Sequence, residues 1–328
     1  MSWSLPFNGR RSIVSDAYHR VALTVQLGEV YTKGFLESAK ELALANLLHI
    51  NLVIPPKYPG SIANAVESLR RLEQDIASAY SAPNITFIQT SRKLFLSIHM
   101  QNDAFPLANS LLASDLEVDL WILDVIGEKN ASLANIHEMH RLIKHAGKKT
   151  HLGIGNCEGP RELDWFLSKI QPEAISLVYL GNITLPNLFL HSIELVHTAG
   201  LTSMVSLTAT ALEQDIASSA QLNELATKYD IASDAFLSKC LLQLGCVVAL
   251  PYGYYNDGTR AESVSRLAHP FVHRRPFVSM FRVISLSIQP EDMQVLMSQS
   301  EAYEAKDDSF WTPHSTARSS DRTLTYQK

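Results

Sequence analysis

The chain of 328 residues has little cysteine, little net charge and no long apolar run. Its three cysteines, Cys157, Cys240 and Cys246, are too few and too irregularly spaced for a disulfide framework or a cysteine metal site. A formal net charge of -5 argues against a nucleic-acid-binding protein, which needs a basic surface. No run approaches the roughly 18 apolar residues of a membrane helix, and the first residues lack the apolar core of a signal peptide. These absences predict a soluble, cytoplasmic protein with neither a nucleic-acid nor a membrane partner.

What the sequence does contain is a regular alternation of short β-rich runs and longer helical ones. Eight strands are expected, over 20–28, 50–56, 94–100, 118–126, 150–156, 174–180, 201–208 and 246–253. Helical apolar spacing is found over 35–49, 62–80, 104–115, 132–146, 159–170, 185–199 and 221–244. Eight such βα units favour an α/β fold of the closed (β/α)8 TIM-barrel type over an open, doubly wound sheet.

No linker, internal repeat or heptad pattern divides the chain, so we expect a single barrel domain over residues 1–328. After about residue 305 the sequence is rich in Ser, Thr and Arg, which predicts a C-terminal tail or a flap over the barrel mouth. The run 85–91 is also strand-like and has no place in the eightfold pattern.

Polar residues stand at the carboxyl ends of three predicted strands, where barrel enzymes carry their active sites. They are His99, Asp124 and Asn156. Because side chains alternate along a strand, His99 and Asp124 are both expected to face the barrel interior and to hydrogen-bond. The carboxylate would stabilise the imidazolium form of His99 and so provide a catalytic general acid. The alternative is that both are ordinary, satisfied polar residues at a barrel rim.

Five further residues near predicted strand ends are candidates for a role at such a site. Tyr58 follows the second strand, and its hydroxyl could donate to a substrate oxygen during catalysis. A surface tyrosine after a Pro-Pro-Lys turn would explain Tyr58 equally well. The candidates for substrate binding, besides Asn156, are one acid and three aromatic residues that could hold a flat apolar molecule: Glu29, Tyr179, Tyr252 and Tyr254.

Two motifs of the kinds that bind a metal ion or a dinucleotide are incomplete. His137 and His140 lie three residues apart on a predicted helix without the accompanying carboxylate pattern, so no metal site is expected. The segment GIGNCEG (153–159) has the glycine spacing GxGxxxG and lacks a following acidic ribose ligand, so it does not form a dinucleotide fingerprint.

Over roughly residues 20–300 the sequence resembles the aldo-keto reductases. Residues 224–251 look like that family's penultimate helix pair and last strand, and VDLWILD (118–124) resembles its fourth strand. GIGNC (153–157) is similar to its fifth-strand GxSN signature, 47–58 to its second strand and the loop after it, and 288–296 to the start of its final helix. The resemblance implies a barrel of the aldo-keto reductase type.

The resemblance also shows that the catalytic residues have changed. Members of the family reduce carbonyls with NADPH and an Asp, Tyr, Lys and His tetrad. The lysine position falls on His99, the histidine position on Asp124, and the tyrosine position on Tyr58, while the aspartate position falls near Val53 and Ile54. A degenerate tetrad of this kind does not support ordinary carbonyl reduction.

Most cofactor contacts implied by the resemblance are also altered. Asn156 is retained from the pair that binds the nicotinamide carboxamide. The neighbouring serine is replaced by Gly155, the tyrosine that stacks on nicotinamide falls near Ser206, and a glutamine beside that tyrosine falls near Ser176. The lysine and serine that hold the adenosine phosphate in the family are replaced by Tyr252 and Gly253. We therefore expect no cofactor.

The sequence favours a cofactor-independent acid–base enzyme acting on a small apolar molecule, as a monomer or homodimer. Isomerisation or rearrangement (epoxide opening, for example), cyclisation or dehydration would suit a His–Asp pair. The departures resemble those of reductase-like proteins from fungal secondary metabolism that rearrange epoxides, which implies a secondary-metabolite substrate. Two alternatives stay open: a non-catalytic regulatory subunit, like the reductase-like modifier subunit of glutamate–cysteine ligase, and an NADPH-dependent reductase.

Overall fold

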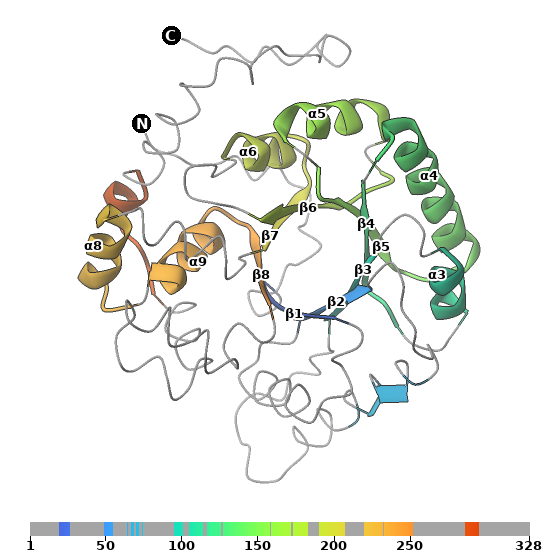
Figure 1. Ribbon diagram of the computed structural model, residues 1–328, viewed down its shortest axis with the longest axis horizontal. Helices are drawn as coiled ribbons and strands as arrows, with labels where there is room; N and C mark the ends of the chain where they lie inside the picture. The colour runs from blue at the N-terminus through green and yellow to red at the C-terminus, as the bar shows by residue number, and fades with distance from the viewer. Residues whose placement is uncertain are drawn as a thin grey trace.

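A computed structural model describes residues 20–26, 49–54, 95–100, 105–113, 117–125, 127–157, 159–171, 173–182, 190–206, 220–231, 233–251 and 286–294, with a few helical positions between 64 and 74. Eight parallel strands form a closed barrel in sequence order, with β1 hydrogen-bonded to both β2 and β8 (Figure 1). The strands are β1 (Val21–Gln26), β2 (His49–Ile54), β3 (Phe95–Met100), β4 (Leu120–Asp124), β5 (His151–Gly155), β6 (Leu177–Asn182), β7 (Thr202–Ser206) and β8 (Val247–Pro251). The predicted (β/α)8 barrel is confirmed.

The described helices lie around the outside of the barrel (Figure 1). They are α3 (Phe105–Leu112), α4 (Lys129–His145), α5 (Pro160–Lys169), α6 (Leu190–Thr198), α8 (Ala220–Lys228) and α9 (Ser233–Gln243). Within the described ranges, no helix is long and apolar enough to cross a membrane. The run 85–91, the tail after residue 305 and most of the predicted helix 35–49 lie outside the described residues, although His49 itself belongs to β2.

Two apolar layers hold the barrel together because each strand is buried on both faces. The outward-facing residues pack against the helices; among them, Trp121, Ile154 and Val248 are almost completely buried. A second cluster fills the interior of the barrel, and it consists of Ala22, Phe95, Leu120, Ile122, Leu177, Tyr179, Met204, Val247 and Ala249. Burial on both faces explains why the strands read as nearly continuous apolar runs.

Part of the interior is polar. His49 Nε2 lies 2.9 Å from Ser97 Oγ, and Ser97 Oγ donates to Asn51 Oδ1 at 2.9 Å. The Asn51 amide in turn donates to Thr24 Oγ1 at 3.2 Å. These bonds link the inner faces of β1, β2 and β3 and satisfy side chains that would otherwise be costly to bury. They support the strand that carries His99.

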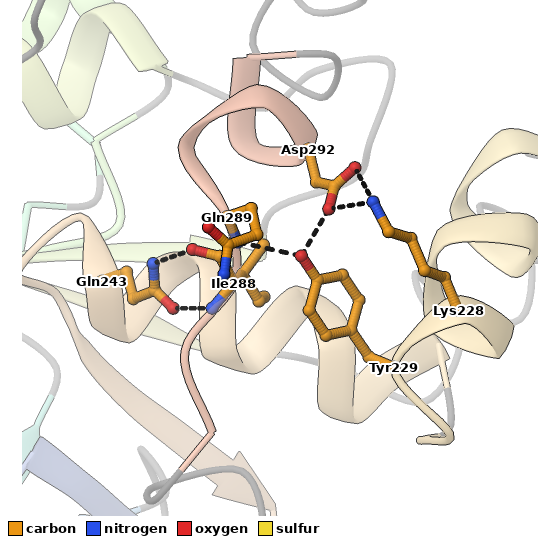
Figure 2. Close-up of polar contacts among 6 residues, drawn as sticks. All are labelled: Lys228, Tyr229, Gln243, Ile288, Gln289 and Asp292. Carbon is orange, nitrogen blue, oxygen red and sulfur yellow. Dashed lines mark hydrogen bonds and ion pairs between the residues drawn. The ribbon is translucent and has the colours of Figure 1, made fainter.

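Residues 286–294 dock onto α8 and α9, with a short helix beginning at Pro290 (Figure 2). The side-chain amide of Gln243 accepts from the backbone N–H of Ile288 at 2.7 Å and donates to its carbonyl at 3.1 Å. Ile288 is buried in the outer core. Asp292 accepts hydrogen bonds from Lys228 Nζ at 2.8 and 2.9 Å and from the Tyr229 hydroxyl. The last described segment is therefore held by both backbone and charged contacts.

The docking of this segment should depend on the charge of Asp292. The hydrogen bond from Lys228, followed by that from Tyr229, lowers the pKa of Asp292, and the same contact raises the pKa of Lys228. The pair therefore contributes fully between the ordinary pKa values of about 3.8 and 10.5, and it weakens outside that window. Because Lys228 is exposed, salt screens the contribution.

We expect Asp292→Asn to lower the protection factors of the Ile288 and Gln289 amides at neutral pH, and acidification of the wild type below about pH 3.8 to lower them as well, each exchange rate being compared with the unprotected rate at the same pH. Exchange measured by NMR on both proteins, at low and high salt, tests this. Equal protection in the variant and the wild type would show that the Gln243 contacts suffice.

Candidate functional site

A histidine and an aspartate meet at the carboxyl end of the barrel. His99 is the penultimate residue of β3 and pairs with Ile122 of β4, so that Asp124 lies one inward-facing position further along the neighbouring strand. His99 Nε2 lies 2.5 Å from Asp124 Oδ1. The two residues are only 4% and 5% exposed. The predicted contact between His99 and Asp124 is confirmed, and its catalytic role remains a prediction.

Asn156 orients the carboxylate. Its Nδ2 donates to Asp124 Oδ1 at 2.9 Å, so this oxygen accepts two hydrogen bonds. Asn156 directly follows β5 with a φ of 57°, a left-handed conformation that asparagine tolerates better than most residues. Its backbone N–H donates to the carbonyl of Tyr179 at 3.1 Å. The side chain that the sequence assigned to substrate binding is thus turned toward Asp124.

Two glycines make this arrangement sterically feasible. A Cβ on Gly155 would lie 2.8 Å from Asp124 Oδ1 and 3.2 Å from His99 Nε2. A Cβ on Gly181, which has a φ of 60°, would lie 2.7 Å from Asn156 Oδ1. Real Cβ atoms do not approach polar atoms so closely, so larger residues would displace the His–Asp–Asn cluster. In the sequence, Gly155 stood out only as the replacement of a serine, and nothing distinguished Gly181.

Tyr179 forms one wall beside the imidazole. Its ring meets His99 edge to face, with centroids 4.4 Å apart and an interplanar angle of 69°. Its hydroxyl is hydrogen-bonded to Ser206 at the end of β7. Burial raises the pKa of Tyr179 to about 12, so the phenol stays protonated at neutral pH. Tyr179 was expected to bind substrate, and its position beside His99 makes it available for that role.

One nitrogen of the buried histidine has no hydrogen-bond partner among the described residues. Asp124 as a carboxylate can only accept, so we assign the Nε2 proton to His99. His99 Nδ1 is buried and has no hydrogen-bond partner among the residues that the structure describes. An unpaired buried ring nitrogen is costly unless a ligand or water meets it. The carboxylate fixes the imidazole through Nε2 and leaves Nδ1 as the ring nitrogen without a described partner.

Several expected residues lie elsewhere or cannot be placed. Tyr58, Glu29, Tyr252 and Tyr254 fall outside the described residues. The placement of the family's glutamine near Ser176 was wrong: Ser176 precedes β6, and its Oγ lies 3.2 Å from Nδ1 of His151 at the start of β5. Ser176 therefore lies at the opposite end of the barrel from His99.

The described residues offer no evident metal site. No group of three or more His, Cys, Asp or Glu side chains among them could hold an ion. His137 is exposed on α4 and His140 is half-buried.

Structural comparisons place the fold among known enzymes. The chain resembles an aldose reductase from Schistosoma japonicum, with 14% identity and a TM-score of 0.57 over 85% of this chain and 88% of the other. It also resembles an aldo-keto reductase from a Medee basin deep-sea metagenome, with 16% identity and a TM-score of 0.53 over 85% of this chain and 90% of the other. An aldo-keto reductase from Brucella melitensis is similar as well, with 14% identity and a TM-score of 0.53 over 85% of this chain and 94% of the other. No protein-family profile matches the sequence, and no curated protein sequence matches it significantly. At these identities the likeness shows the barrel type.

The described residues do not reproduce the nicotinamide cradle that the fold implies. One amide N–H of Asn156 is used by Asp124, and its amide oxygen faces Gly181 at close range. At the end of β7, Ser206 offers a small hydroxyl bonded to Tyr179 in place of an aromatic ring for stacking. At these two positions the polar groups therefore bond to Asp124 and to Tyr179.

Proposed function

We propose that this protein is a cofactor-independent acid–base enzyme that rearranges, cyclises or dehydrates a small apolar molecule, and that His99 is its proton donor and acceptor. One observation carries the proposal: a buried imidazole whose Nε2 is fixed by Asp124 and whose buried Nδ1 has no hydrogen-bond partner among the described residues. Carboxylate-held histidines serve this purpose on unrelated folds, because the carboxylate orients the ring and stabilises its charged form.

An epoxide substrate, as the resemblance to secondary-metabolism proteins implies, illustrates the chemistry. His99 Nδ1–H donates its proton to the epoxide oxygen while one C–O bond breaks. A neighbouring group then migrates to the electron-poor carbon, and the resulting protonated carbonyl returns its proton to Nδ1. Asp124 stabilises the imidazolium before donation, and the protonated Tyr179 phenol beside it offers a further hydrogen bond to the oxygen. Product and substrate are isomers.

The mass of the product tests this proposal, because a rearrangement gives an isomer of the substrate. Metabolite profiling after deletion of the gene identifies the compound that accumulates, and the purified protein is incubated with it without added reductant. We expect a product of unchanged mass, or of mass lowered by one water for a dehydration. A product that has gained two hydrogen atoms, formed only when NADPH is supplied, would replace this proposal with carbonyl reduction.

Reduction by NADPH is the second candidate because the solved structures of similar fold are aldo-keto reductases. We expect weak binding of NADPH, since several contacts worth about 1–3 kcal/mol each are missing and their loss lowers affinity by orders of magnitude. Calorimetric titration measures this directly. A low-micromolar dissociation constant would contradict the expectation and favour the reductase.

A further inference from the structure

A chain of hydrogen bonds inside the barrel links β2 and β3 to β1 and ends at Thr24. His49 Nε2 lies 2.9 Å from Ser97 Oγ. Ser97 Oγ donates to Asn51 Oδ1 at 2.9 Å, and the carbonyl of Ile50 lies 3.4 Å from the same hydroxyl. Because the Ser97 hydrogen is used by these acceptors, His49 Nε2 is the donor of the first bond. Asn51 Nδ2 then donates to Thr24 Oγ1 at 3.2 Å, so the last bond of the chain points toward β1.

The hydroxyl hydrogen of Thr24 is left over at the end of this chain. Thr24 Oγ1 accepts from Asn51, and its O–H has no acceptor among the residues that the structure describes. The amide oxygen of Asn51 is taken by Ser97, so it does not compete for this hydrogen. A hydroxyl that already accepts a hydrogen bond is polarised and donates more strongly. Thr24 thus presents an oriented hydrogen-bond donor to the interior of the barrel.

The inner surface of the barrel is accessible beside this hydroxyl. On the inner face of β1, Thr24 is half-buried and Gln26 is exposed, and on β2 Val53 is half-buried. His99 and Asp124, by contrast, are only 4% and 5% exposed. Among the inner-facing residues whose burial is described near the carboxyl ends of the strands, those with accessible surface therefore lie on β1 and β2. A ligand that enters the barrel meets this side first.

The strand register places Thr24 and His99 at the same height in the barrel. Thr24 pairs with Asn51 of β2, and Asn51 pairs with Ser97 of β3. In an eight-stranded barrel with a shear of about eight, the residue at a given height lies about one position further along each successive strand. Two strands after Thr24, that residue lies two positions beyond Ser97, which is His99. Side chains from alternate strands share one layer of the interior, so the Thr24 hydroxyl and the His99 imidazole belong to the same layer.

We propose that Thr24 binds the substrate by donating its hydroxyl hydrogen to a neutral oxygen acceptor: a carbonyl, ether or epoxide oxygen. Asn51 fixes the direction of the hydroxyl, and Val53, which pairs with His99, provides an apolar surface for the carbon skeleton next to that oxygen. The substrate is thereby held on the accessible side of the barrel, in the layer that contains His99. This assignment rests on the proposed function only in taking the barrel mouth as the substrate site.

Cyclohexanone tests the assignment without any turnover, because it is neutral and its carbonyl can only accept hydrogen bonds. In wild-type protein labelled with ¹³C at the threonine methyl groups, cyclohexanone should shift the Thr24 signal. The Thr202 signal should not move, since Thr202 is buried at the start of β7, at the opposite end of the barrel. The ¹⁵N resonances of His99, in protein labelled at histidine, should shift with the same dissociation constant because both residues lie in one layer.

Three variants separate the hydroxyl of Thr24 from the shape of its side chain. Thr24→Val keeps the shape and should weaken cyclohexanone binding about threefold to tenfold, the range expected for the loss of one neutral hydrogen bond. Thr24→Ser keeps the hydroxyl and should bind within about twofold of the wild type. Thr202→Val, the matched control, should leave the affinity unchanged. The dissociation constants are measured through the His99 resonances of the folded proteins.

A Thr24 methyl signal that cyclohexanone leaves unmoved in the wild type overturns the assignment, whether or not the variants fold. A folded Thr24→Val protein with the affinity of the wild type overturns it too, as does an equal loss in Thr202→Val. None of these results bears on the mass of the product, which tests the proposed function. Binding that depends on Thr24 in a protein without isomerising activity would remove the proposed function alone.

Discussion

Asp124→Asn should lower turnover by about 10²–10⁴-fold, the range expected when general acid–base catalysis is removed. Asparagine keeps the shape of the side chain and can still meet His99 Nε2 and Asn156 Nδ2, but it carries no charge to stabilise imidazolium. The measurement is the initial rate on the accumulated metabolite identified by gene deletion.

His99→Ala should cost a comparable factor, and the double variant little more, because residues that act as one unit are not additive. Asp292→Asn is the matched control, since it replaces the same side chain in a structural contact on α8 and α9 and should leave turnover unchanged. Melting temperatures on the same preparations separate catalysis from folding. Full activity per folded molecule in Asp124→Asn would end the catalytic assignment of the His99–Asp124 pair.

The sequence was sufficient to predict the fold and the His99–Asp124 contact because both follow from periodicity. Alternation along β3 and β4 places both side chains in the interior, and parallel strands bring their carboxyl ends together. Periodicity could not predict where each strand ends or the backbone conformation at the strand ends. The sixth strand was expected over 174–180 and occupies Leu177–Asn182, so Tyr179 and Gly181 lie at the site while Ser176 does not. Ala174 and Ile175 are buried although they precede β6, so the apolar pattern in the sequence begins before the strand does.

The hydrogen bond from Asn156 to Asp124 could not be predicted from the sequence, for a different reason. A polar residue after a strand can turn toward a ligand or toward a neighbouring side chain, and the choice depends on its φ and on the space around it. Here a left-handed φ at Asn156 and the absence of a Cβ at Gly181 direct the amide to Asp124. The interior network of His49, Asn51 and Ser97 was missed because His49 was expected to end the helix over 35–49, and Asn51 and Ser97 were considered only as parts of predicted strands.

Gly155→Ala should be the most informative small change at the site. The added methyl group would lie 2.8 Å from Asp124 Oδ1, 3.2 Å from His99 Nε2 and 3.2 Å from Ile122 Cγ2, so the histidine and the carboxylate must move apart. Overpacking of this kind costs about 1–3 kcal/mol of stability. A displacement of about 1 Å in catalytic groups can cost about 10²-fold in rate, so we expect a loss of turnover near that size.

Gly153→Ala is the matched control on the same strand and the same face, because its methyl group would lie 2.9 Å from the carbonyl oxygen of Leu177 and would not touch the His–Asp pair. Both variants should therefore melt at lower temperatures, but only Gly155→Ala should lose turnover per folded molecule and shift the ¹⁵N resonances of His99. Stability and activity that fall in parallel for the two variants would mean that the barrel simply tolerates no extra volume on β5. An active Gly155→Ala protein with unshifted His99 resonances would show that the 2.5 Å contact is not what the reaction requires.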